Sequence, residues 1–144
     1  MIRIVPLKKA SQSILKDLVH LVSELRRNKA EHKGSLADLR HIVANKNAVM
    51  IVVQDGARVV GMGTLYMVRK VGKHVGYIED IVVSHEYRGQ GLGKKIMRSL
   101  ITAARKQKLA YLFLTSNSKR EAANKLYERL GFEIVETNPY RLKL

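Results

Sequence analysis

The hydrophobic positions at the start of the chain follow first a strand and then two helices. An apolar run at residues 2–7 predicts a short strand. From about Ser11 to Asn28 the apolar positions return every three or four residues, which predicts an amphipathic helix. The segment Ser35-Leu36-Ala37-Asp38 has the spacing of a capping box and predicts the start of a second helix. Two helices are therefore expected before most of the sheet.

An alternating pattern replaces the helical period in the middle of the chain. Residues 48–54 and 58–71 are rich in β-branched side chains, and the Asp55-Gly56 pair between them is a strong hairpin signal. Gly72 and Lys73 then turn the chain into a further strand that ends near Val83. The pattern therefore predicts a hairpin followed by a third strand.

The third strand carries two adjacent acids, Glu79 and Asp80. Successive side chains of a strand point to opposite faces, so we expect the two carboxylates on different faces. Glu79 has apolar neighbours, and desolvation would raise its pKa and suit it to accept a proton. It is a candidate general base, with pairing to a lysine across the strand as the alternative. We expect Asp80 to be structural and to accept hydrogen bonds near a bulge, because a buried unpaired acid is costly.

The second half of the chain alternates helices with strands. Apolar residues recur every four positions from Leu92 to Ala104, which predicts a helix on the sheet with a Lys/Arg-rich last turn. A buried strand, a helix with a second capping box at Ser118 and Glu121, and two closing strands are expected at 110–115, 118–131, 132–135 and 140–144. This order predicts an α/β (α+β) protein with a mixed sheet covered by helices on both faces.

A glycine-rich turn, Arg88-Gly89-Gln90-Gly91-Leu92-Gly93, joins the acid-bearing strand to the following helix. Its glycines permit positive φ and close approach of backbone N–H groups to an anion, and the helix N-terminus adds further donors. A P-loop would need Ser or Thr where Lys95 stands. A dinucleotide fold would need the third glycine one position later and an acid about 20 residues on. The turn thus predicts an anion cradle outside both of these classes.

Composition narrows the class of protein. The length of 144 residues and the 46% apolar content suit a single domain over residues 1–144. The lack of cysteine excludes disulfides, thiolate zinc sites and a cysteine nucleophile, and the histidines show no metal-ligand spacing, so no metal is expected. The sequence has neither a bilayer-spanning stretch nor a signal-peptide pattern. We therefore expect a cytoplasmic protein without a membrane partner.

The turn and its surroundings resemble motif A of the GCN5-related N-acetyltransferases (GNAT), whose signature is filled by Arg88, Gly91 and Gly93. The preceding acid-bearing strand, the following helix and Tyr127 extend the resemblance to about residues 50–135. It implies a mostly antiparallel, mixed sheet of about six to seven strands flanked by about four helices, with two parallel strands that splay apart. It also implies direct transfer of an acetyl group from acetyl-CoA to a primary amine of a small molecule or protein.

The resemblance further implies roles for particular residues. The pantetheine arm would lie against the backbone of one strand and the pyrophosphate against the glycine turn. Tyr127 matches a tyrosine near the cofactor sulfur and is the candidate general acid, with packing at the edge of the core as the alternative. Asn117 and Asn124 match cofactor contacts, with helix capping as the alternative for Asn117. The expected cofactor-binding residues are Ile81, Val82, Val83, Arg88, Gly89, Gln90, Gly91, Leu92, Gly93, Lys94, Asn117 and Asn124.

The formal net charge of +15 agrees with a phosphate-rich ligand. Between Tyr87 and Arg120 there are nine basic residues and no acid. Coenzyme A and nucleic acid would both be attracted to this segment. The alternative is that most of these residues only form a generally basic surface and bind no ligand. The chain has no tryptophan, and Phe113 and Phe132 sit in apolar runs, which argues against a nucleic-acid partner because no stacking platform is left. A basic nucleic-acid-binding module and a catalytically idle acyl-CoA sensor are the non-enzymatic alternatives.

The sequence says less about the amine that accepts the acetyl group than about the cofactor. The acid-bearing strand and the turn are similar to glucosamine-6-phosphate acetyltransferases, and Arg141 resembles a phosphate-binding arginine of that group. However, Thr115-Ser116-Asn117-Ser118 replaces the acidic loop expected there, so a small amine and a protein amine stay open as well. A polycationic acceptor fits the basic surface less well, unless a local acidic patch around Glu31, Glu79 and Glu136 accepts it. Proteins of this resemblance commonly dimerise, and residues 140–144 would offer an edge for a homodimer.

Overall fold

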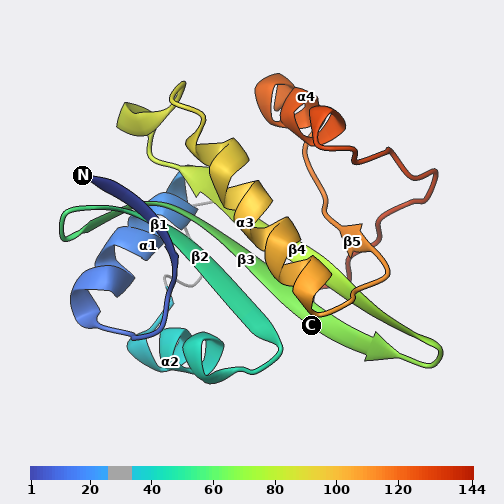
Figure 1. Cartoon of the computed structure of the whole chain (residues 1–144), viewed down its shortest axis with the longest axis horizontal. Helices are drawn as coiled ribbons and strands as arrows, with labels where there is room; N and C mark the ends of the chain where they lie inside the picture. Colours follow the sequence, from blue (N-terminus) through green and yellow to red (C-terminus); the bar gives the residue numbers. More distant parts are fainter. Residues whose placement is uncertain (26–33) are drawn as a thin grey trace. The chain divides into compact units, whose positions relative to one another are not determined.

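The computed structural model describes residues 1–25 and 34–144, which fall into two compact units, Met1–Leu114 and Thr115–Leu144. The first unit contains all the strands of the described chain (Figure 1). Its elements are β1 (Ile2–Pro6), α1 (Gln12–Leu25), α2 (Leu36–Ala44), β2 (Ala48–Asp55), β3 (Arg58–Lys70), β4 (Lys73–Val83), a 3-10 turn (His85–Tyr87), α3 (Leu92–Lys106) and β5 (Leu112–Phe113). The second unit contains α4 (Glu121–Arg129). None of these helices is long and apolar enough to cross a membrane.

The five strands form one sheet in the order β1-β2-β3-β4-β5. Strands β1 to β4 pair antiparallel with their neighbours, and β5 runs parallel to β4. The predicted hairpin is confirmed, since Asp55 and Arg58 pair across its turn. The α/β class with a mixed, mostly antiparallel sheet is confirmed as well, with fewer strands than expected.

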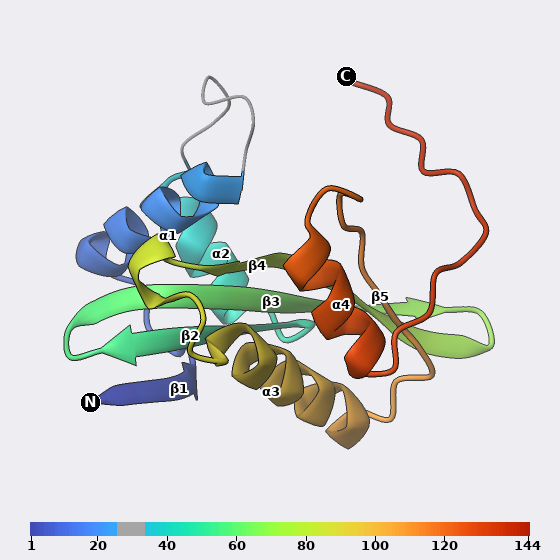
Figure 2. The same ribbon diagram turned by 90° about the horizontal axis from the view of Figure 1, so that it is seen from above.

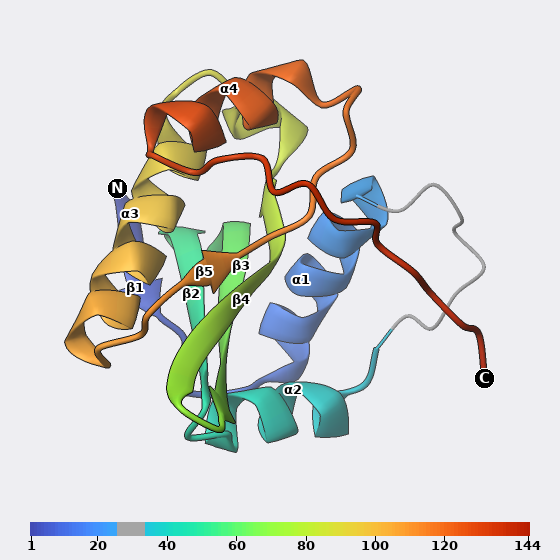
Figure 3. The same cartoon turned by 90° about the vertical axis from the view of Figure 1, so that its right-hand side faces the viewer.

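Helices cover both faces of this sheet. Figure 2 shows α1 and α2 on one side of β2–β4 and α3 on the other, and Figure 3 shows the same layers from the end. The predicted four-residue repeat of α3 is confirmed, because Leu92, Ile96, Leu100 and Ala104 are all buried. A second apolar core lies between the sheet and the first two helices and consists of Leu18, Leu21, Leu39, Met50, Val52, Val59, Met62 and Val82. Burial of this apolar surface on both faces fixes the plane of the sheet.

Glycine allows α3 to pack closely on the sheet. A Cβ atom at Gly63 of β3 would lie only 2.7 Å from Cγ2 of Ile96, closer than two carbon atoms can approach. The absence of a side chain at Gly63 therefore brings α3 against β3. This packing sets the position from which α3 begins, directly after the glycine turn.

The first two helices begin largely as expected. The Ser35 capping box is confirmed: Asp38 N–H donates to Ser35 Oγ at 3.1 Å, and Ser35 N–H donates to Asp38 Oδ2 at 2.7 Å. Helix α1 is described as far as Leu25. The rest of its predicted range, to Asn28, lies outside the described residues, as does Glu31 of the predicted acidic patch.

A bulge in β4 overturns the simple alternation expected for Glu79 and Asp80. Glu79 pairs with Thr64 and Val82 pairs with Met62, so two residues of β4 stand opposite the single Gly63. Asp80 takes a left-handed conformation with φ 54°, which Asp tolerates better than most residues. An extra residue resets the side-chain alternation. The two neighbouring carboxylates are therefore not held on opposite faces by a regular strand.

The second unit differs most from the predictions. Ser118 does not cap α4, whose N-cap is Arg120, because Asn117 closes the preceding turn by accepting the Lys119 N–H at 2.9 Å. Gly131 does end the helix as predicted, with φ 95°. Residues 132–135 and 140–144 form no strand, although their β-branched and aromatic side chains favour one. A strand needs a partner for its backbone, and here the described pairings supply none, so that Ile134, Tyr140 and Leu144 are exposed.

Candidate functional site

The glycine turn after β4 presents a row of backbone donors. Gly89 and Gly91 have φ of 78° and 73°, the left-handed region that favours glycine. The first helical bond of α3 runs from Lys95 N–H to Gly91 C=O at 3.2 Å. Within the described chain, the N–H groups of residues 89–94 donate to no protein acceptor. Together with the positive end of the α3 dipole, they can bind an anion such as a pyrophosphate.

One side-chain contact and one backbone contact just before the turn hold it in place. Tyr87 O–H donates to Asp55 Oδ2 at 2.7 Å, which connects the turn to the end of β2. This hydrogen bond lowers the pKa of Asp55 and raises the pKa of Tyr87. Ser84 N–H donates to Val60 C=O at 2.8 Å, so the chain is also fixed to β3 just before the turn. The N–H groups that follow are thus carried on a supported turn.

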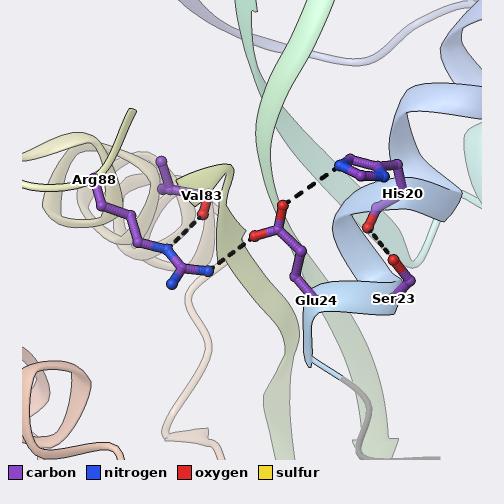
Figure 4. Close-up of polar contacts among 5 residues, drawn as sticks. All are labelled: His20, Ser23, Glu24, Val83 and Arg88. Atoms are coloured by element: carbon purple, nitrogen blue, oxygen red, sulfur yellow. Dashed lines mark hydrogen bonds and ion pairs between the residues drawn. The ribbon is translucent and has the colours of Figure 1, made fainter. Parts of the chain in front are cut away.

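Arg88, expected to contact phosphate, has other partners in the structure (Figure 4). Its Nε donates to Val83 C=O at 3.0 Å, and one of its terminal nitrogens donates to Glu24 Oε2 at 2.9 Å. Its backbone N–H donates to His85 C=O at 3.3 Å. The backbone N–H and the guanidinium of Arg88 are thus both hydrogen-bonded to protein groups, whereas the N–H groups of residues 89–94 have no protein acceptor in the described chain.

The outer edge of β4 is open next to the turn. Strand β5 pairs only with Gly76 and Tyr77, near the start of β4. From Ile78 to Val83 no strand of the described chain pairs with β4 on that side. An extended ligand can therefore add to the backbone of Ile81, Val82 and Val83 as a strand would. This arrangement agrees with the predicted splay between two parallel strands.

Glu79 lies within this unpaired stretch of β4, directly before the bulge, and interacts electrostatically with its neighbour Asp80. Desolvation, and secondly the charge of Asp80, raise the pKa of Glu79. The same two acids act on Tyr66 of β3. Burial raises the pKa of its hydroxyl, and the negative charges of Asp80 and Glu79 raise that pKa further. The predicted rise in the Glu79 pKa is confirmed in direction, and part of its cause is the carboxylate expected on the other face. These groups can bind a cation or accept a proton.

A buried hydroxyl lies opposite Glu79. Thr64 pairs with Glu79 across β3 and β4, and its side chain is 1% exposed. Its Oγ1 has no hydrogen-bond partner among the described residues. Buried polar atoms usually have a hydrogen-bond partner. An unpaired hydroxyl beside an acid therefore indicates a position that is not optimised for the stability of the sheet.

The second unit contains the other three expected site residues. Tyr127 is 6% exposed and packs edge-on against Phe132, with ring centroids 6.1 Å apart. Burial raises the pKa of Tyr127, although Arg120 opposes the shift, so the hydroxyl keeps its proton well above neutral pH. The Asn124 side chain donates to Asn117 C=O at 3.0 Å, and the Asn117 side chain closes its own turn. Both asparagines therefore have local structural roles, but Asn117 does not cap α4, whose N-cap is Arg120.

Sequence reasoning missed Thr64, Tyr66 and Glu24. The first two had a usable signal in the strand register. The turn after Lys70 pairs Lys70 with Lys73, and counting back along both strands brings Thr64 opposite Glu79, with Tyr66 two residues further along β3. Glu24 had no such signal, since it meets Arg88 from a helix 64 residues earlier in the chain. Such a contact follows from packing and not from a local pattern.

Comparison with known proteins agrees with this geometry. Residues 15–132 match the Acetyltransferase (GNAT) family. A glucosamine 6-phosphate N-acetyltransferase of Trypanosoma brucei brucei is 37% identical over 106 residues, which are 72% of this chain and 69% of the relative. A thialysine N-epsilon-acetyltransferase of Bos taurus is 37% identical over 79 residues, which are 54% of this chain and 46% of the relative.

The solved structures extend the likeness to the whole described fold. The crystal structure of a Trypanosoma brucei acetyltransferase aligns over 100% of both chains, with a TM-score of 0.80 and 30% identity. The family match covers more than half of the chain and includes the bulged strand, the glycine turn and the helix with Tyr127. The chain belongs to the GNAT acetyltransferase family and is an N-acetyltransferase.

Proposed function

We propose that the enzyme binds acetyl-CoA along the open edge of β4 and over the glycine turn, and transfers the acetyl group directly to a primary amine. The observation that carries this proposal is the continuity of two features of the described chain: a strand edge without a paired strand is followed directly by the N–H groups of residues 89–94, which donate to no acceptor there. A pantetheine arm and a pyrophosphate have that order in coenzyme A. The family itself uses acetyl-CoA, and the absence of cysteine leaves direct transfer as the simplest route.

In this proposal Glu79 and Tyr127 move the protons. The Glu79 carboxylate, directly or through water, accepts the proton that the acceptor's ammonium group loses before its nitrogen attacks the thioester carbonyl carbon. The carbon–sulfur bond of the tetrahedral adduct then breaks, and the Tyr127 hydroxyl donates a proton to the departing thiolate. The excess proton of the attacking nitrogen replaces it on the Tyr127 oxygen, directly or through water. The raised pKa of Glu79 supports its role as proton acceptor, and the raised pKa of Tyr127 keeps its hydroxyl in the protonated form that a donor needs. The family match spans both compact units, which supports one working domain.

We propose a positively charged acceptor. Glu79, Asp80 and the Tyr66 hydroxyl act on one another electrostatically, and two carboxylates attract an ammonium group while repelling a phosphate. A lysine-like or polyamine acceptor fits this chemistry. The second candidate is an amino-sugar phosphate, favoured by the 37% identity to the glucosamine 6-phosphate N-acetyltransferase.

Thermal stability with acetyl-CoA, coenzyme A and NAD tests the cofactor first, because a ligand that binds only the folded state raises the melting temperature. We expect a rise with the two CoA species alone. Thiol release from acetyl-CoA is then measured with spermidine, lysine, a lysine-containing peptide and glucosamine 6-phosphate. Faster release with the cationic amines supports the proposal, whereas preference for the sugar phosphate contradicts it. A rise in stability without release from any amine would leave an acyl-CoA sensor.

A further inference from the structure

The side chain of Arg88 connects three parts of the first unit. Arg88 itself begins the glycine turn, its Nε holds the C=O of Val83 at the end of β4, and its terminal nitrogen reaches Glu24 on the last turn of α1. Figure 4 shows the guanidinium between the strand end and the helix, and pointing at both acceptors. The open edge of β4, the anion-binding turn and helix α1 are thus fixed by one side chain.

The acceptor of this contact is well shielded. The Glu24 side chain is 20% exposed, while that of Arg88 is 53% exposed. Glu24 also lies 3.6 Å from Nε2 of His20, through its other oxygen, and His20 is 73% exposed. Glu24 and Arg88 form the short contact of this cluster, and a planar guanidinium that donates to two acceptors at once is restrained in orientation.

We propose that the Glu24–Arg88 ion pair is a positioning clamp for the cofactor turn, and that the Arg88 guanidinium is not itself a phosphate ligand. This inference rests on the proposed function, because it assigns a role within the same cofactor site. The clamp fixes the point at which the turn leaves β4, so the N–H groups of residues 89–94 face the anion before it arrives. Such preorganisation lowers the ordering cost of binding.

The direction in which one substitution changes the affinity for coenzyme A distinguishes a clamp from a phosphate contact. Glu24→Gln removes a negative charge and frees the guanidinium. If Arg88 bound phosphate, coenzyme A would bind equally well or more tightly, because a competing carboxylate is gone. If the pair is a clamp, coenzyme A binds more weakly, by about three- to tenfold, since misplacement of a turn weakens every contact it makes. Isothermal titration of the full chain with coenzyme A measures the difference.

Glu86→Gln is the matched control. Glu86 precedes Tyr87 in the 3-10 turn, is exposed, and makes no ion pair among the described residues, so the change removes the same charge even closer to the glycine turn. General electrostatics would affect both variants alike. We expect the affinity of Glu86→Gln for coenzyme A to equal or slightly exceed that of the wild type, and only Glu24→Gln to lose affinity.

A double-mutant cycle tests the coupling. Arg88→Met and Glu24→Gln should each weaken the binding of coenzyme A. The double variant should bind it no more weakly than the single variants, because each substitution alone already removes the same ion pair. Glu24→Asp provides a conservative second variant if Glu24→Gln does not fold, since it keeps the charge and shortens the reach. The melting temperature of the ligand-free variants should stay close to the wild type, because an ion pair whose arginine is half exposed contributes little stability.

The outcomes are distinguishable. No binding of coenzyme A to the wild type would remove the proposed function, and the clamp with it. Binding by the wild type with tighter or unchanged binding by Glu24→Gln would overturn the clamp alone and return Arg88 to the phosphate. A loss of affinity that only follows a lowered melting temperature would show a merely structural contact and overturn it too. Selective loss in Glu24→Gln and Arg88→Met, without additivity, supports it.

Discussion

The cofactor turn that follows β4 and the acid pair within β4 are built in different ways. At the end of β4, the turn offers backbone N–H groups, which need only the correct φ at Gly89 and Gly91. In the middle of β4, Glu79 and Asp80 offer charged side chains whose properties depend on the bulge and on β3 opposite. The turn is therefore encoded by a short stretch of sequence, and the acid pair by strand pairing.

This difference sets what each part of the site tolerates. A backbone cradle should withstand changes of side chain but fail when its dihedral angles are altered. A carboxylate site should fail on loss of one oxygen or shift its pH response when a neighbouring charge is removed. Substitutions in the turn and in the acid pair can therefore test this difference, and the largest effect is expected where the proposed chemistry takes place.

Glu79→Gln should lower kcat/KM by about 10²- to 10⁴-fold, the usual range for loss of a general base. Coenzyme A should bind as before, because the turn is untouched. The pKa of Glu79 is raised in the folded state, so its stabilising contribution is present below its unfolded pKa and is lost as the pH rises through the folded value. At neutral pH the variant should therefore melt slightly higher than the wild type. Turnover that is unchanged at every pH would remove Glu79 from the mechanism.

Gly91→Ala should weaken coenzyme A binding by roughly tenfold, because a Cβ at φ 73° costs about 1 kcal/mol and shifts the turn. Gly56→Ala is the control: Gly56 also has a positive φ of 58° and open space around it, but lies in the β2–β3 hairpin. Both variants should lose similar stability by urea denaturation. Only Gly91→Ala should lose affinity in the titration, and equal affinities would argue against a backbone cradle.

Asp80→Asn should change the pH response more than the maximal rate. The charge of Asp80 contributes to the raised pKa of Glu79, so its removal should lower that pKa and move the acid limb of kcat/KM to lower pH. Asn also tolerates the left-handed conformation of Asp80, which keeps the bulge intact. The measurement is a pH profile of thiol release. An acid limb that stays in place would show that another group controls it.

The sequence was most informative where a local pattern decides structure. The repeat Leu92, Ile96, Leu100, Ala104 and the Ser35 capping box need only neighbouring residues, and both are confirmed. The glycine turn belongs to the same class. The two closing strands were predicted from composition but depend on a backbone partner elsewhere, and the structure shows none for them in the described chain.

The site followed the same division. The bulge expected near Asp80 is confirmed, but the left-handed conformation of Asp80 could not be derived from alternation, because a bulge is an exception to the period of two. The partners of Arg88 were also beyond the motif, which specifies an arginine and not the direction of its side chain. The Tyr87–Asp55 hydrogen bond joins residues 32 apart and arises because the hairpin end lies beside the turn. These contacts are set by tertiary packing.

The smallest expected effect concerns Thr64. Thr64→Val replaces a buried hydroxyl that lacks a partner by a methyl group of similar size, so stability should be unchanged or rise by about 0.5–1 kcal/mol. If Oγ1 serves only the strand, kinetic constants will not move. If it supports the acceptor side of the site beside Glu79, KM for the amine should rise a few-fold while KM for acetyl-CoA stays constant. Urea denaturation and steady-state kinetics on the one variant therefore show whether the acid part of the site extends onto β3, as its dependence on strand pairing implies.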